Sequence, residues 1–216
     1  GTPAIGDRYA QTGDTAERIA RGEYSWKMLG GDWQLAGEAA FNSLRNEYPA
    51  FGGQWDVVHH TQLIDRLLSE KRIEVRPTHE RVLLHDPCYL GRHNDVYSAP
   101  RKIVGSIKGV QIVEMPRNGT KGMCCGAGGA RMWMEESIGT KVNDERAQEA
   151  ISTGASRVAT ACPFCYIMLD DGVKAAGAEE DTVKVADIAI HLMDALENGE
   201  RRLAEQNAPL AASPGE

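Results

Sequence analysis

Residues 157–169 read RVATACPFCYIML, which is a short β-branched run, then a cysteine, then an apolar stretch that begins with proline and contains a second cysteine. The run Arg157–Thr160 predicts a buried strand, and the proline that opens Pro163–Ala176 is favourable at the first position of a helix. Three similar runs predict three further strands, at Arg81–Leu84, Val110–Val113 and Val183–Val185.

Helical patterns separate these strands. Helices are expected over Pro100–Ile107, Gly129–Ile151 and Asp187–Leu196, the last with its aspartate as N-cap. Alternation of β-branched strands with helices predicts an α/β fold, built as a parallel sheet with helices on both faces.

The chain has five cysteines in the pattern C-x35-CC-x36-C-x2-C, namely Cys88, Cys124, Cys125, Cys162 and Cys165. Their odd number, with no recognisable signal peptide, argues against a disulfide framework. Each group of cysteines follows a predicted strand. Because open parallel sheets bind ligands outside the carboxyl ends of their strands, we expect the five thiols to converge at one edge of the sheet.

Three kinds of site could use these thiols. Zinc takes four ligands, which five thiols exceed, and the adjacent pair Cys124 and Cys125 would strain to reach one small ion. A dithiol redox centre at Cys162 and Cys165 would leave three cysteines unused. An iron–sulfur cluster spreads its ligand positions and takes thiolates, so it is favoured, with zinc and thiol chemistry left open.

The residues around the cysteine pair suit a negatively charged group. Gly126, Gly128 and Gly129 allow backbone N–H groups to approach closely, and Arg131 offers a positive charge, so these four are candidate cofactor-binding residues. Helices starting after Gly129 and Cys162 would direct their N-termini at the site.

Three segments closely resemble the cysteine-rich CCG domain of heterodisulfide reductase B subunits, glycolate oxidase iron–sulfur subunits and lactate-utilisation proteins. They are His85–Arg92 (HDPCYLGR), Cys124–Gly129 (CCGAGG) and Cys162–Cys165 (CPFC). The resemblance implies one complete CCG domain over 76–198, with a cubane or non-cubane 4Fe–4S cluster held by the five cysteines. It also implies a redox role and identifies no catalytic residue.

The run Met132–Arg146 is similar to large iron–sulfur reductases that link electron-transferring flavoprotein to menaquinone. This implies an electron-transfer module of a membrane-associated oxidoreductase, which passes electrons toward a quinone or a disulfide. One implied source of these electrons is electron-transferring flavoprotein in fatty-acid oxidation. The implied partners are a flavoprotein, a ferredoxin-like segment and a quinone-reactive membrane subunit. The implied location is cytoplasmic, at the inner face of the cell membrane. A zinc-binding, non-catalytic docking module is the alternative.

The first 75 residues are interpreted as a partial, degenerate CCG-like copy without cysteines, in which Gln11, Gly37 and Ala40 replace them. A strand over Trp55–Val58 would place His59 and His60 near the cysteines, as core residues or as a ligand or proton relay. Residues 199–216 are expected to form a disordered tail.

Composition narrows the function. The 216 residues carry a net charge of −7, which argues against a nucleic-acid binder, and no apolar run is long enough to span a membrane.

Near the cysteines, the pair His85-Asp86 is expected to form a turn with Pro87, with a hydrogen bond to the site as the alternative. Trp133, with the methionines on either side, is expected in the core.

Overall fold

The computed structural model describes residues 24–28, 31–35, 38–178 and 182–196. The chain divides into two compact units, 1–36 and 37–216. In the first unit, β1 (Tyr24–Met28) and β2 (Gly31–Leu35) form an antiparallel pair, which the sequence did not predict. Gln11, Gly37 and the predicted tail at 199–216 lie outside the described residues.

The second unit is built on a four-stranded parallel sheet with the order β4-β3-β5-β6. Its strands are β3 (Arg81–Leu84), β4 (Gln111–Val113), β5 (Arg157–Thr160) and β6 (Lys184–Asp187). The predicted parallel sheet is therefore confirmed, with β6 shifted toward the C-terminus from the expected Val183–Val185. The β-branched and apolar residues of these runs form the strands because both faces of the sheet are buried.

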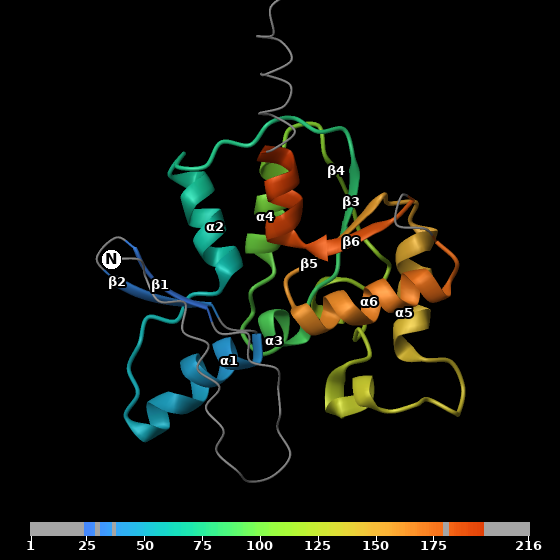
Figure 1. Cartoon of the computed structure of the whole chain (residues 1–216), viewed down its shortest axis with the longest axis horizontal. Coiled ribbons are helices and arrows are strands. Elements are labelled where there is room, and N and C mark those ends of the chain that lie inside the picture. The colour runs from blue at the N-terminus through green and yellow to red at the C-terminus, as the bar shows by residue number, and fades with distance from the viewer. Residues whose placement is uncertain (1–23, 29–30, 36–37, 179–181, 197–216) are drawn as a thin grey trace, which may run out of the picture. The chain divides into compact units, whose positions relative to one another are not determined.

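Helices cover both faces of this sheet (Figure 1). Val82 and Leu84 face one apolar cluster, while Leu83 between them faces the other, as the two-residue period of a strand requires. The first cluster packs against α2 (His60–Ser69), α4 (Ser98–Ser106) and the helical residues 188–196. The second packs against α5 (Val142–Ser152) and α6 (Pro163–Ala175).

Short helical turns connect these elements. They are α1 (Glu38–Asn42), the π-helix η1 (Ser43–Glu47), the 3-10 helix η2 (Tyr48–Phe51), α3 (Cys88–Gly91), and the 3-10 turns η3 (Gly119–Lys121) and η4 (Gly128–Trp133). Among the described residues, no helix is both long and apolar enough to cross a membrane.

The long helix expected over Gly129–Ile151 is wrong. Its first part is the 3-10 turn η4, where Gly129 and Ala130 have left-handed φ angles of 65° and 62°, and the α-helix begins only at Val142. Trp133 is 71% exposed, so its expected place in the core is also wrong. Left-handed residues end an α-helix, and mixed apolar spacing alone did not reveal this interruption.

The strand expected over Trp55–Val58 is also wrong, because these residues form no regular element. The helix that follows, α2, packs against α4 of the sheet domain. A second CCG-like copy is therefore not seen among the described residues.

Gly172 fixes the close crossing of α5 and α6. A Cβ atom there would lie 2.7 Å from the backbone oxygen of Asn143 and 2.8 Å from the Cβ of Ala147. We expect Gly172→Ala to lower the free energy of unfolding by about 1–3 kcal/mol, measured by urea denaturation. The matched control is Gly105→Ala in α4, where the new Cβ meets only ordinary contacts and higher helix propensity should leave stability unchanged or improved. Equal effects of the two changes would contradict this packing account.

His191 predicts a pH dependence of stability. Its Nδ1 lies 3.2 Å from Arg157 and its Nε2 lies 3.2 Å from the Val158 carbonyl, and burial lowers its pKa to about 4 from 6.5. Because the unfolded chain then binds this proton more readily, stability is lost as the pH falls from about 6.5 toward 4.

We expect His191→Gln to remove about 2 kcal/mol of the stability difference between pH 7 and pH 5, measured by urea denaturation at both values. Some dependence will remain, since burial also lowers the pKa of His59, to about 3. An unchanged slope in the variant would show that His191 does not carry this effect.

Candidate metal centre

The sheet has a topological switch point between β3 and β5. The chain leaves β3 toward β4 on one side, and leaves β5 toward β6 on the other. The backbone N–H of His85 donates to the Ala159 carbonyl at 2.9 Å, so the pairing of the two strands continues past the end of β3. Ligand sites of open α/β sheets form in the crevice at such a point.

All five cysteines are free thiols, and the structure brings their three segments together at this crevice. Cys125, Cys162 and Cys165 are buried and form one packed cluster. Cys88, at the start of α3, is partly buried and lies close enough for Cys125 and Cys162 to affect its ionisation. Cys124 is exposed and contacts Cys125. The thiols therefore form one connected group with a buried side and an exposed side.

Contacts between the thiols shift their pKa values in opposite directions. Contacts with Cys124 and Cys165 lower the pKa of the Cys125 thiol strongly, and the contact with Cys165 lowers the pKa of Cys162 despite burial. The same contacts, together with burial, raise the pKa of Cys124 and Cys165. A group this dense can hold all its thiols as thiolates only when a cationic centre compensates their charge.

Backbone N–H groups point at the sulfur atoms. Gly126 donates to Cys124 Sγ at 3.3 Å, and its φ of 100° is a conformation that favours glycine. A Cβ at Gly126 would also lie 3.1 Å from the backbone nitrogen of Asn143. The N–H groups of Phe164 and Cys165, in the first turn of α6, lie close enough to Cys162 to help lower the pKa of its thiol. The expected N-terminus of α6 is thus at the site, whereas the expected helix start after Gly129 is not.

The other predicted cofactor-binding residues lie differently. Gly128 is beside Cys124, since a Cβ there would be 3.8 Å from its Sγ, while Gly129 faces open space. The side chain of Arg131 is 53% exposed and pairs with Glu136. Its guanidinium is therefore engaged with the partly buried carboxylate of Glu136 rather than with the thiols.

Asp86 fastens the loop that carries the cysteine pair. Its carboxylate accepts two bonds from Arg101, at 2.7 and 2.9 Å, and one from the Gly119 N–H at 2.6 Å. Burial alone would raise the pKa of Asp86, but these hydrogen bonds hold it below its usual value. Arg92 adds a bond to the Gly122 carbonyl. The sequence predicted a turn at Asp86, with a hydrogen bond to the site as the alternative, and did not identify Arg101 or the Gly119 N–H as its partners.

A cavity of about 80 Å³ lies between these segments. Its lining residues come from the β3, α3 and β4 connections and from α6, and they are His85, Asp86, Pro87, Cys88, Arg92, Tyr97, Gly119, Gly122, Met123, Cys124, Cys125 and Cys165.

His85 joins the thiols, which the sequence indicated only as an alternative to a turn. Potential ligand atoms of His85, Cys125 and Cys165 lie within 4.8 Å of one another, and all three residues are buried. Its neighbour Arg146 was not predicted at all, because an arginine inside a polar helical run is ordinarily solvated.

His59 and His60 also lie at the carboxyl edge of the sheet, although no strand precedes them. His60 Nε2 is 3.4 Å from Asp187 Oδ1, at the end of β6. His59 caps α2, accepting from the Thr61 N–H and donating its own N–H to Gln62. Across the part of the chain that is described, the potential metal-ligand group includes neither histidine.

Comparison with known proteins agrees with this geometry. The family described as "Cysteine-rich domain" (CCG) matches residues 82–170. The "Probable iron-sulfur-binding oxidoreductase FadF" of Bacillus subtilis is 43% identical over 168 residues, which are 77% of this chain and 24% of that protein. The "EtfAB:quinone oxidoreductase" of Syntrophomonas wolfei is 41% identical over 165 residues, 73% of this chain and 23% of that protein.

A more distant relative is a subunit of the dihydromethanophenazine:CoB--CoM heterodisulfide reductase of Methanosarcina barkeri. It is 33% identical over 159 residues, 70% of this chain and 39% of that protein. The chain thus spans about a quarter of the length of the first two relatives. Residues 82–170, which hold all five cysteines, therefore match the CCG family of cysteine-rich domains.

Proposed function

We propose that this chain is an iron–sulfur electron-transfer module, in which residues 76–198 bind a 4Fe–4S cluster. The observation that carries the proposal is the meeting of five free thiols, from three segments far apart in sequence, at the switch point of a parallel sheet. The proposed ligands are Cys88, Cys124, Cys125, Cys162 and Cys165.

The donor set fits such a cluster. Thiolates are the usual ligands of iron–sulfur clusters, whereas a structural zinc site closes with four ligands and leaves a fifth thiol unexplained. The N–H groups of Gly126 and of the first turn of α6 stabilise negative charge on the sulfur atoms. A bound cluster would accept and donate one electron at a time.

Different residues of the chain shield the proposed cluster, hold its loops together and leave one side open to a redox partner. The buried side, with Cys125, Cys162 and Cys165, shields the centre from water. Asp86 and Arg92 hold the loop of Cys124 against the segment of Cys88. Because Cys124 is exposed, its side of the group is the one that a redox partner can approach.

The names of the relatives support a role within a larger redox system. They describe an iron-sulfur-binding oxidoreductase, a quinone oxidoreductase and part of a heterodisulfide reductase. We therefore propose electron transfer toward a quinone or a disulfide, with a flavoprotein as donor and a quinone-reactive membrane subunit as partner. In this arrangement the module works at the inner face of the cell membrane through its partners.

Metal and sulfide analysis tests the cofactor directly. Protein purified without oxygen should contain about four irons and four sulfides per chain and show a brown visible absorption, because a 4Fe–4S cluster has that composition. Acid treatment should release the sulfide and remove the colour. A colourless protein with about one zinc and no sulfide would instead support the docking module.

Cys125 tests the ligand set, since it contacts Cys124 and Cys165 within the group. Cys125→Ser should lose at least about half of the bound iron or convert the cluster to another type, because the serine hydroxyl is a poor substitute for a soft thiolate. Iron analysis and electron paramagnetic resonance spectra provide the measurement.

The control is Met168→Leu, which changes an apolar side chain packed on the same cysteine cluster and conserves its volume. This variant should keep its iron and its spectrum. Full iron and an unchanged spectrum in Cys125→Ser would remove Cys125 from the ligands.

A further inference from the structure

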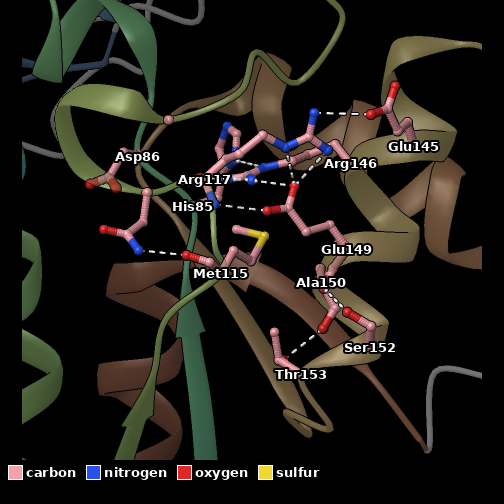
Figure 2. A network of polar contacts seen from close by, with 12 residues as sticks. His85, Asp86, Met115, Arg117, Glu145, Arg146, Glu149, Ala150, Ser152 and Thr153 are labelled. Atoms are coloured by element: carbon pink, nitrogen blue, oxygen red, sulfur yellow. Dashed lines mark hydrogen bonds and ion pairs between the residues drawn. The ribbon is translucent and has the colours of Figure 1, made fainter.

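His85 stands between the thiols and a buried arginine. It directly follows β3 and is only 3% exposed. Its Nδ1 accepts a hydrogen bond from Nε of Arg146 at 3.2 Å, as Figure 2 shows. One of its ring nitrogens also lies within 4.8 Å of the sulfur atoms of Cys125 and Cys165.

Arg146 is held in one orientation. Its side chain is 0% exposed, and Nη1 donates to Glu149 and to the Arg117 carbonyl, each at 2.9 Å. Glu149 is in turn held by the backbone N–H and Nε of Arg117, at 2.9 and 3.0 Å (Figure 2). A buried charge is tolerated only with such partners, so the network fixes where Nε points.

This contact determines the tautomer of His85. Guanidinium nitrogens only donate hydrogen bonds, so the nitrogen that faces Arg146 must be an acceptor and carry no proton. In a neutral imidazole the proton then lies on Nε2. An imidazole that bound iron through Nε2 would need its proton on Nδ1, directly opposite the Arg146 donor.

We propose that His85 donates its Nε2–H to the Cys125 thiolate and is not an iron ligand, and that Arg146 acts as the positioning residue that enforces this arrangement. The inference rests on the proposed function, because it concerns a thiolate of the cluster. It is supported by the position of His85, a potential ligand atom of which lies within 4.8 Å of those of Cys125 and Cys165, and His85 is one of several groups that lower the pKa of the Cys125 thiol.

The consequence is a higher reduction potential. A reduced cluster carries one more negative charge, so a hydrogen bond to its thiolate stabilises the reduced state more than the oxidised one. The hydrogen bond is present in both states, so only part of its contribution differs between them. We therefore expect a measurable but moderate effect.

The test compares His85→Leu with His85→Gln in the cluster-loaded chain. Gln places an amide N–H near the position of Nε2, whereas Leu has no donor. At a fixed ambient potential, His85→Leu should lower the ratio of reduced to oxidised cluster about threefold to tenfold, a tenfold change being about 59 mV for one electron. His85→Gln should stay near the wild type, and both should keep about four irons.

Two further variants complete the test. Arg146→Met removes the donor to Nδ1 and should shift the ratio in the same direction, by less than His85→Leu. The control is His191→Leu, which removes another buried histidine that contacts an arginine, at the opposite end of β5, and should leave the ratio unchanged. If His85→Leu does not fold, Arg146→Met carries the test.

The outcomes separate the two proposals. A wild type without iron overturns the proposed function and this inference with it. A wild type with four irons and an unshifted ratio in both His85→Leu and Arg146→Met overturns the inference alone. Loss of iron, or a changed electron paramagnetic resonance spectrum, in both His85 variants shows that His85 is a ligand and also overturns it.

Discussion

The pairing of β3 with β5 is the constraint on which the site depends. Their parallel ladder continues into the bond between the His85 N–H and the Ala159 carbonyl, so the connections after both strands start from the same level of the sheet. The first connection carries Cys88 and the second carries Cys162 and Cys165. Since the chain turns to opposite sides after these strands, the crevice between them stays open. The third segment, with Cys124 and Cys125, returns from β4 and closes the group.

Two charged networks hold the crevice from opposite directions. Asp86 ties the β3 connection to α4 through Arg101 and to the returning loop through Gly119. Arg146 ties His85 to α5 and to Glu149. Both networks place charge in poorly solvated positions, where an unpaired group would be costly, so they fix geometry rather than add much stability. The proposed effect of His85 on the cluster follows from this rigidity.

The sequence predicted those parts of the fold and site that local patterns encode. Apolar runs placed the four strands of the parallel sheet, and the cysteine spacing located the three segments at its carboxyl edge. The break after Gly129 was missed because it depends on left-handed backbone angles at Gly129 and Ala130. Arg146 was missed because its burial is set by long-range contacts with His85 and the Arg117 carbonyl, which no local pattern contains. His59 and His60 lie at the carboxyl edge of the sheet because they start helix α2, with His59 as its N-cap, and not because a strand precedes them.

Diffraction data collected at the iron absorption edge, from crystals grown without oxygen, test the central claim most directly. The account predicts several anomalous peaks close together in the crevice, within bonding reach of sulfur atoms from all three cysteine segments. A single metal peak bound by four thiols, or iron density outside the crevice, would contradict it.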